Sequence, residues 1–244
     1  AGSLNGETVK VTIPEGYTVE QIIALLAKNK VSGAEALTEA AKNATFEYEY
    51  IDNKNLGSIS RLEGFLFPDT YDFYVGEKAQ SALNRLIKNF DKKLTAELRT
   101  AIKAAGYTIP QVVTIASLIE RETDGKDHAK IASVIYNRLN NPNAGTVGKL
   151  QIDASVLYGL PAHEGALTSA DKEVDTPYNL YKYKGLPPTP IGNPGLASLN
   201  AAIAPEKTDY YYYALGKDKA HHFFKSYNEH VNFTKSAQYA GDSK

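Results

Sequence analysis

The sequence of 244 residues contains no cysteine and no tryptophan. Without cysteine the chain can form neither a disulfide framework nor a thiolate metal site, and this absence fits an exported protein. No apolar run is long enough to span a bilayer, and no signal peptide is recognisable. The net charge of −1 with 43% hydrophobic residues is typical of a globular protein and argues against a nucleic-acid partner.

The aromatic residues are mostly tyrosine, with 17 Tyr beside 8 Phe. A tyrosine offers a flat apolar face and a hydroxyl group, which suits the binding of sugar rings. Tyrosine is also common in β-strands, so the count alone leaves both interpretations open.

The first 58 residues read as a small α/β module. A strand in VKVTIPEG is followed by a helix that starts at Thr18, with Gln21 at capping-box spacing. A second short helix in SGAEALTEAAKN and a strand in TFEYEYI complete a unit of LysM-like size and order. We expect residues 1–58 to form this LysM-like module, which either binds glycan or serves as a spacer.

Residues 59–244 read as a mixed α+β domain. The sequence predicts one long helix over 77–105 that ends at Gly106, and another helix in HAKIASVIYNRLNN. A loop-rich segment runs from Pro161 to Pro194 and contains several tyrosines, which favours a functional loop. A short helix in GLASLNAAIAP, a strand in DYYYYAL and a strand leading into a helix close the chain. The predicted fold class is therefore α+β, with helices around a groove.

The stretch TIPQVVTIASLIERET predicts an amphipathic helix, with Thr108 near its N-cap and Pro110 in its first turn. Its six apolar residues cover one broad arc, and Arg121 falls opposite that arc. Glu120 and Glu122 fall on opposite flanks, each roughly 70–90° from the centre of the arc. Both carboxylates therefore lie at the edge of a buried face.

A carboxyl group in such a place tends to keep its proton near neutral pH, and it can then donate that proton to a leaving group. The alternative is a structural salt bridge to a nearby arginine such as Arg138. Helical periodicity does not choose between the two glutamates.

Other common chemistries lack their motifs. The five histidines form no HExxH pattern, so we expect no metal. There is no dinucleotide or phosphate-binding glycine motif and no GxSxG, and Ser117 with Glu120 but no histidine is not a nucleophile system. Carboxylate chemistry remains. Glycoside cleavage needs a protonated acid, and an N-acetyl sugar can itself stabilise the anomeric centre, so that one Glu is enough.

Several short motifs, in order along nearly the whole chain, resemble the YceG/MltG-like family of endolytic murein transglycosylases. The motifs are VTIPEGYTVEQIIALLAKNKV, LEGFLFPDTYDF, IASLIERET, VIYNRLNN, LQIDASVLYGL, DTPYNLYKYKGLPPTPIGNPGLASLNAAIAP, DYYYYAL and HHFFKSYNEH. The first Glu of the family's ASxxExET pattern maps onto Glu120, with no departure at the key positions. The resemblance, and not the helix geometry, thus selects Glu120 over Glu122.

The resemblance implies a reaction. The substrate is the glycan strand of peptidoglycan, cut between N-acetylmuramic acid and N-acetylglucosamine within the strand to leave a 1,6-anhydromuramyl end. Glu120 first acts as general acid on the glycosidic oxygen and then as base toward the muramyl C6 hydroxyl. No cofactor is required.

The resemblance also implies a location and partners. Family members carry a membrane helix, so we expect a membrane-anchored protein whose catalytic part faces away from the cytosol and works with cell-wall synthases and the elongation or division machinery. This chain lacks the anchor, and its opening AGSLNGETVK resembles the trimmed edge of a longer protein.

Further residues are expected to line the groove, because amides and tyrosines suit N-acetyl groups and sugar faces. These candidates are Glu63, Asn137, Arg138, Gln151, Asp153, Tyr178, Asn179 and Tyr181, with Ser117 and Glu122 in support. Structural roles remain open for them: Arg138 as a partner of Glu122, Asp153 as a helix cap, and Glu63 as an anchor between domains.

Two other functions remain open. One is a catalytically silent glycan-binding or scaffold protein, which the presence of Glu120 disfavours. The other is a muramidase that hydrolyses the bond, with Asp153 or Glu122 activating water. An aminodeoxychorismate lyase activity is disfavoured because no lysine stands in a phosphate-site context.

Overall fold

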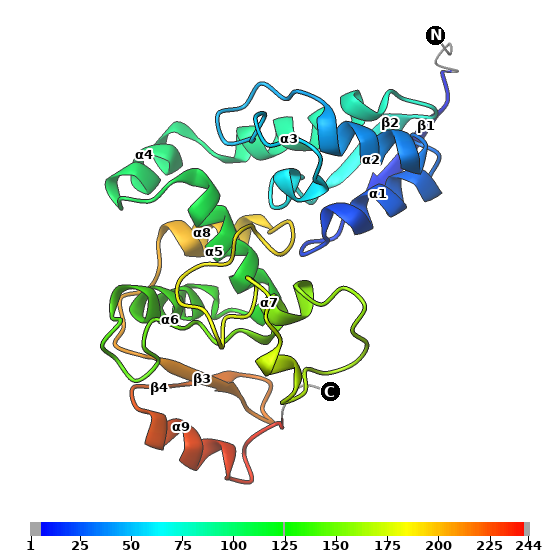
Figure 1. The fold of residues 1–244 in the computed structure, drawn as a ribbon. Coiled ribbons are helices and arrows are strands. Elements are labelled where there is room, and N and C mark those ends of the chain that lie inside the picture. Colours follow the sequence, from blue (N-terminus) through cyan, green and yellow to red (C-terminus); the bar gives the residue numbers. More distant parts are fainter. Residues whose placement is uncertain (1–5, 124, 242–244) are drawn as a thin grey trace. The chain divides into compact units, whose positions relative to one another are not determined.

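The computed structural model describes residues 6–123 and 125–241. Within these residues it contains nine α-helices and four short strands, which confirms the mixed α+β class (Figure 1). The chain divides into two compact units, one made of residues 1–117 and 189–199 and the other of residues 118–188 and 200–244. The predicted domains, 1–58 and 59–244, do not coincide with these units, and they stay a prediction.

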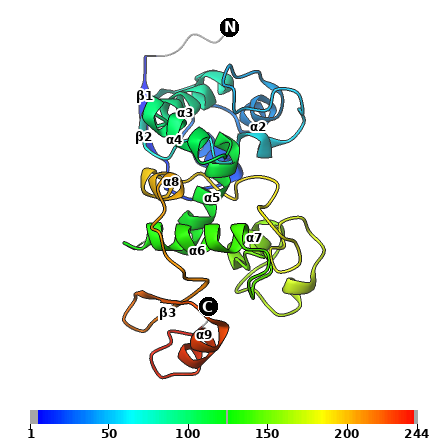
Figure 2. The same ribbon diagram turned by 90° about the vertical axis from the view of Figure 1, so that its left-hand side faces the viewer.

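The first unit contains an antiparallel pair of strands, β1 (Thr8–Thr12) and β2 (Thr70–Tyr74), in which Val11 lies opposite Tyr71. Helices α1 (Val19–Lys28) and α2 (Ala34–Asn43) follow β1 (Figure 2). The predicted capping box is confirmed: the Thr18 hydroxyl accepts a hydrogen bond from the Gln21 amide, and the Gln21 side chain accepts one from Thr18.

The strand predicted at residues 45–51 is wrong, since this segment is irregular and β2 pairs with β1 instead. The Asn53 side chain accepts a hydrogen bond from the Phe46 amide and donates one to the Phe46 carbonyl. Phe46 and Tyr50 are buried in the core. Alternating aromatics here anchor a loop, and the LysM-like character of the module stays a prediction.

The single helix predicted over 77–105 is also wrong, because the structure has two helices there, α3 (Ala79–Lys93) and α4 (Ala96–Ala104). Leu94 leaves the helical conformation with ψ 75°. The Thr95 hydroxyl then accepts a hydrogen bond from the Leu98 amide at 3.4 Å and starts α4. The cap formed by Thr95 therefore interrupts the helix, although the helical periodicity of the sequence continues through it.

The second unit contains α6 (His128–Asn140), α7 (Asp153–Tyr158) and an antiparallel hairpin of β3 (Tyr212–Leu215) and β4 (His221–Phe224). Helix α9 (Tyr227–Thr234) packs against this hairpin (Figure 1). Helix α5 (Ile109–Glu122) and helix α8 (Leu196–Ile203) each contribute residues to both units. The predictions for α6, α8, β3, β4 and α9 are confirmed. The Pro161–Pro194 segment is irregular apart from one short 3-10 helix, η2 (Asp171–Glu173).

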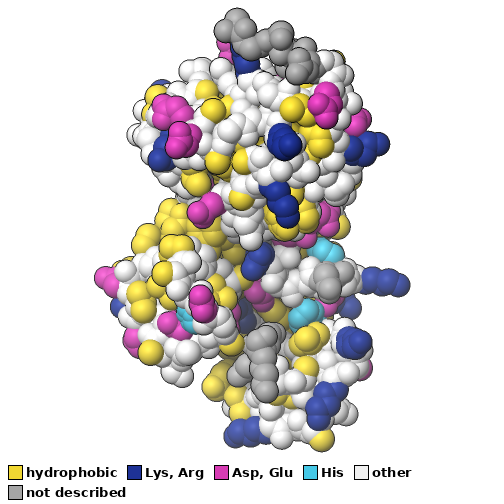
Figure 3. Space-filling model, turned by 90° about the vertical axis from the view of Figure 1, so that its right-hand side faces the viewer, with side chains coloured by type: hydrophobic (Ala, Val, Ile, Leu, Met, Phe, Trp, Pro, Cys, Tyr) yellow, Lys and Arg dark blue, Asp and Glu magenta, His cyan; other side chains and the backbone are white. Residues whose placement is uncertain are grey.

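No single helix among the described residues has the length and apolar character needed to cross a membrane; only α4 and α5, bent by 96° at their junction, meet that test as a pair. On the face drawn in Figure 3, acidic and basic side chains are intermixed, in keeping with the net charge of −1.

Candidate active site

Helix α5 carries the two candidate glutamates near its C-terminal end. The helix starts as predicted: the Thr108 hydroxyl accepts a hydrogen bond from the Gln111 amide, and the Gln111 side chain accepts one from the Thr108 amide. The six apolar residues of the predicted arc, Val112, Val113, Ile115, Ala116, Leu118 and Ile119, are each at most 2% exposed. Arg121 is exposed, while Glu120 and Glu122 are half-buried. Both glutamates thus lie at the edge of the buried face, as predicted.

The carboxyl group of Glu122 is enclosed and accepts a hydrogen bond from the Tyr213 hydroxyl on β3. Burial raises the pKa of this carboxyl, and the nearby charge of Asp153 raises it further. The Tyr213 hydrogen bond and the charge of Arg138 act in the opposite direction without reversing the shift. The environment that makes a carboxyl keep its proton therefore surrounds Glu122.

Arg138 on α6 lies in the same cluster and is only 6% exposed. Its Nε donates to the Tyr211 carbonyl at 2.7 Å, and another guanidinium nitrogen donates to the Leu150 carbonyl. The guanidinium carbon also lies 5.6 Å and 5.9 Å from the ring centroids of Tyr212 and Tyr213. Arg138 therefore ties α6 to β3 and influences Glu122 through its charge.

The turn after α5 is held by a chain of side-chain hydrogen bonds. The Thr123 hydroxyl donates to Asp127 Oδ1 at 2.5 Å, and Asp127 Oδ2 lies 2.7 Å from His221 Nδ1 on β4. Burial acts to raise the pKa of Asp127, but the hydrogen bonds from Thr123 and His221 lower it overall. This chain fixes the end of α5, and hence Glu120, to the hairpin.

A second carboxylate–tyrosine pair joins α7 to the proline-rich loop. The Tyr181 hydroxyl donates a hydrogen bond to Asp153, the first residue of α7, and Lys172 Nζ lies 3.9 Å from the same carboxylate. Lys172 Nζ also lies 4.5 Å from the Tyr181 ring centroid. Burial, then the bond to Asp153, raises the pKa of Tyr181, and the charge of Glu122 adds to this. The structure therefore brings four predicted residues, Glu122, Arg138, Asp153 and Tyr181, within electrostatic reach of one another.

Asn179 is fully buried, and its side chain is committed to the loop that contains it. Its amide nitrogen donates to the carbonyls of Lys172 and Val174, and its side-chain oxygen accepts from the Tyr181 amide. This geometry favours ordering of the loop over contact with an acetamide. Tyr178 is half-buried, with its ring centroid 5.0 Å from that of Tyr158.

Asn137 and Gln151 have different surroundings. The Asn137 amide donates to the carbonyls of Thr208 and Tyr210, both at 2.9 Å, and thereby positions the segment before β3. Gln151 is exposed and has a left-handed backbone with φ 53°, a conformation that is uncommon outside glycine. Its side chain is therefore the more accessible of the two.

The remaining two predicted residues belong to the first unit. Glu63 is 2% exposed, and its carboxylate accepts from the Val19 amide at the start of α1 and from the Asn193 side chain, both at 3.0 Å. Buried Ser117 donates to the Thr114 carbonyl and accepts from the Ile191 amide. These contacts join segments within that unit.

Sequence reasoning missed four residues of the cluster in the second unit: Tyr213, Asp127, His221 and Lys172. Tyr213 and His221 lie in motifs that we interpreted only as strands. Two adjacent histidines next to an aromatic run were the signal, because a half-buried histidine needs a partner.

Among the described residues, no three histidine or acidic side chains gather in a way that could hold a metal ion. A recess of about 600 Å³ is present elsewhere, in the first unit, and neither Glu120 nor Glu122 lines it. The carboxylate cluster is defined here by its hydrogen bonds.

Comparison with known proteins places this arrangement in a family. The chain is 35% identical over 240 residues to the endolytic murein transglycosylase of Bacillus subtilis, covering 92% of this chain and 64% of that protein. It is 32% identical over 228 residues to the protein of the same name from Streptococcus pneumoniae, covering 83% of this chain and 40% of that protein. The chain thus spans between two fifths and two thirds of the length of these curated relatives.

A crystal structure of a YceG-like protein from Listeria monocytogenes is similar, with a TM-score of 0.77 and 34% identity over 92% of this chain and 75% of that one. The model of the YceG-like family matches residues 2–236. With the α5 motif, the hairpin and the loop segments all included in that match, the chain belongs to the YceG-like family.

Proposed function

We propose that this chain is the catalytic part of an endolytic murein transglycosylase. The observation that carries the proposal is the half-buried Glu120 at the end of α5, in a chain 35% identical to a curated enzyme of that name. The substrate is the glycan strand of peptidoglycan, cleaved between N-acetylmuramic acid and N-acetylglucosamine.

In the proposed reaction, the Glu120 carboxyl gives its proton to the glycosidic oxygen as the bond to the muramyl anomeric carbon breaks. The positive charge that develops at that carbon is stabilised by the sugar's own acetamide oxygen. The Glu120 carboxylate then takes the proton of the muramyl C6 hydroxyl, whose oxygen attacks the anomeric carbon. The product is a 1,6-anhydromuramyl end, and Glu120 regains its proton.

Glu122 has a different part in this proposal, as a positioning residue. Its bond to Tyr213 and the Thr123–Asp127–His221 chain hold the last turn of α5 against the hairpin. A rotation of that turn would move Glu120, and small displacements of a catalytic group are costly in rate. Asp153 and Tyr181 lie within electrostatic reach of Glu122 and belong to the same cluster.

Two rival functions make different predictions for the products. A muramidase would add water to the anomeric carbon and leave a reducing end, and a binding protein would leave the glycan intact. Mass spectrometry of the products from purified glycan strands separates the three, because anhydro and reducing ends differ by one water. We expect anhydro ends. Reducing ends only, or uncut strands with a folded protein, would contradict the proposal.

For the full-length protein, we propose a membrane-anchored enzyme with its catalytic part on the extracytoplasmic face, acting beside cell-wall synthases and the elongation or division machinery. The names of the curated relatives support a wall substrate. Crosslinking in cells is the direct test of the partners.

A further inference from the structure

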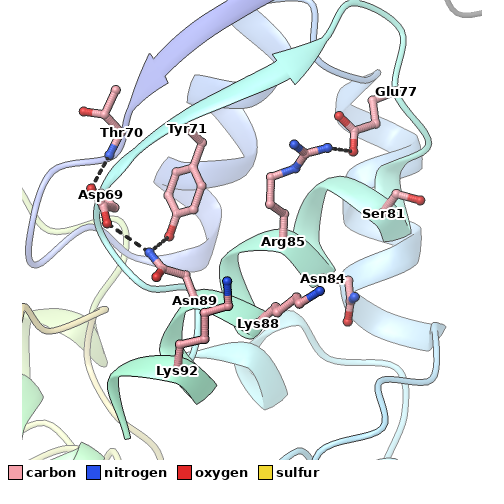
Figure 4. Close-up of a pocket in the computed structure, with 10 residues that line it drawn as sticks. All are labelled: Asp69, Thr70, Tyr71, Glu77, Ser81, Asn84, Arg85, Lys88, Asn89 and Lys92. Atoms are coloured by element: carbon pink, nitrogen blue, oxygen red, sulfur yellow. Dashed lines mark hydrogen bonds and ion pairs between the residues drawn. The ribbon is translucent and has the colours of Figure 1, made fainter.

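A recess of about 600 Å³ lies on the first unit, between β2 and α3 (Figure 4). Side chains from successive turns of α3 form one wall, and Asp69, Thr70 and Tyr71 of the β2 region form the other. The lining is polar and charged, in contrast to the apolar pockets that bind drug-like molecules.

Both carboxylates that line the recess already have partners within the protein. Glu77 forms an ion pair with Arg85 at 2.7 Å, and Asp69 accepts hydrogen bonds from the Thr70 amide and the Asn89 side chain (Figure 4). Those hydrogen bonds lower the pKa of Asp69, so its charge is retained. The negative charges are therefore engaged within the protein.

Lys88 and Lys92 are different. They lie one turn apart on α3, both are exposed, and within the described part of the chain neither has an ion-pair partner. Like charges at this spacing destabilise a helix slightly. The fold therefore keeps two ammonium groups without ion-pair partners, one helical turn apart, among the side chains that line the recess, and an anionic ligand would compensate their charge.

The recess also has spare hydrogen-bonding groups. The side chains of Ser81 and Asn84 make no hydrogen bond to any described residue. Arg85 also lines the recess, but its two terminal nitrogens bond Glu77 and the Asp72 carbonyl, and its Nε is enclosed by the protein. Hydroxyl and amide groups beside two ammonium groups suit a ligand that has both amides and carboxylates.

We propose that this recess binds a short acidic peptide, with carboxylates on Lys88 and Lys92 and peptide groups on Ser81 and Asn84. Murein carries such peptides on its glycan strands, so the source of the ligand rests on the proposed function. Asp69 and Glu77 beside the lysines disfavour a dense polyphosphate and favour a peptide whose carboxylates are spaced apart. The recess would hold the polymer by its peptides, away from the bond that is cleaved.

The test is NMR titration of the ¹⁵N-labelled chain with the acidic stem tripeptide released from murein, which contains no glycosidic bond. We expect shift changes at amides of α3 between Asn84 and Lys92, and weaker binding at higher salt. The double variant Lys88→Gln/Lys92→Gln should lose affinity at least ~5-fold, because both charge contacts are removed.

The control is Lys28→Gln/Lys103→Gln, which removes two exposed last-turn lysines of the same unit, from α1 and α4, and so has the same net charge. It should bind the tripeptide like the wild type. Equal loss in both double variants, equal binding of peptide-free glycan, or preferential binding of poly(glycerol phosphate) would overturn the proposal. Absence of glycan cleavage with intact peptide binding would instead count only against the proposed function.

Discussion

Two glutamates only two residues apart on α5 have different environments. Both side chains are half-buried and lie on opposite flanks of the helix, but the Glu122 carboxyl accepts a hydrogen bond from Tyr213 and has a pKa raised by burial. Environments that differ in this way assign different roles to neighbouring carboxyl groups. In the proposed reaction, Glu122 positions the last turn of the helix and Glu120 transfers the proton.

Glu120→Gln should reduce glycan cleavage by at least ~10²-fold and leave the fold intact, because Gln is nearly isosteric but cannot give up a proton. Turnover measured on purified strands, with circular dichroism on the same samples, checks this. Glu122→Gln is the comparison and should retain more activity, since its amide oxygen still accepts from Tyr213. Near-normal turnover in Glu120→Gln with loss in Glu122→Gln would reverse the assignment.

Glu122 should also affect stability in a pH-dependent way. Burial raises the pKa of its carboxyl above the ordinary value of 4.5, so the folded state holds the proton more tightly than the unfolded state. Its contribution is therefore complete below pH 4.5 and is lost as the pH rises through the folded-state pKa. Relative to Glu122→Gln, the wild type should lose free energy of unfolding over that rise. Urea midpoints of the wild type and of Glu122→Gln from pH 4 to 8 measure the difference, and parallel curves would show that burial of Glu122 does not couple to stability.

Variants of Asn179 and Tyr178, both in the proline-rich loop, should differ when stability and glycan cleavage are measured on the same samples. Asn179→Ala removes three hydrogen bonds inside the loop and leaves buried groups unpaired, so we expect a loss of ~2–4 kcal/mol in stability together with activity. Tyr178→Ala, at a half-buried position, should reduce the rate of glycan cleavage by more than its loss of stability accounts for. Equal ratios of the two effects in both variants would remove Tyr178 from the substrate surface.

At the level of elements, the segment after η1 (Ile59–Leu62) packs closely on α5. A Cβ added at Gly64 would lie 2.5 Å from a Val113 methyl and 2.7 Å from the Pro190 ring, and the backbone has φ 90°. Two separate features require glycine at this position. One is the left-handed backbone conformation, and the other is the close contact of the Gly64 backbone with α5 and with the 189–199 segment.

Gly64→Ala should consequently destabilise the protein by ~3 kcal/mol or more, combining backbone strain with overpacking. Gly57→Ala is the matched control, since Gly57 has φ 99° but nothing within 4 Å of the added Cβ. It should cost only the strain, ~1–2 kcal/mol. Chemical denaturation of both variants gives the difference, and equal losses would show that packing at Gly64 contributes nothing.

Helices with clear caps and apolar arcs were predictable from the sequence, and α5 and α6 begin and end close to where their patterns indicate. The errors fell where a local hydrogen bond competes with periodicity. Thr95 divides the pattern 77–105 into two helices, and Asn53 holds Phe46 in a loop where alternation predicts a strand. The pairing of the strands could not be predicted from the sequence. β1 pairs with β2, some 60 residues later, and which strands pair depends on the packing of the whole unit.

At the scale of the whole molecule, the carboxylate cluster of the second unit draws on residues from α5, α6, α7, the proline-rich loop and the hairpin. Sequence reasoning named four residues of this cluster and missed four others, and it gave neither of the two carboxylate–tyrosine pairings. Tyr213 with Glu122, and Tyr181 with Asp153, join residues 91 and 28 positions apart. A sequence states which polar residues exist, whereas only the fold decides which buried donor meets which acceptor.

The proposed reaction uses only a carboxyl group of the protein and groups of the sugar itself, so it makes a prediction about metal dependence. Cleavage of purified glycan strands should be unchanged in excess EDTA, because neither proton transfer by Glu120 nor attack by the C6 hydroxyl needs a divalent ion. A zinc-dependent amidase assayed on peptidoglycan in the same buffer should lose its activity, which shows that the chelator is effective. Loss of glycan cleavage in EDTA that is restored by a divalent ion, with the fold unchanged by circular dichroism, would mean that Glu120 does not act alone.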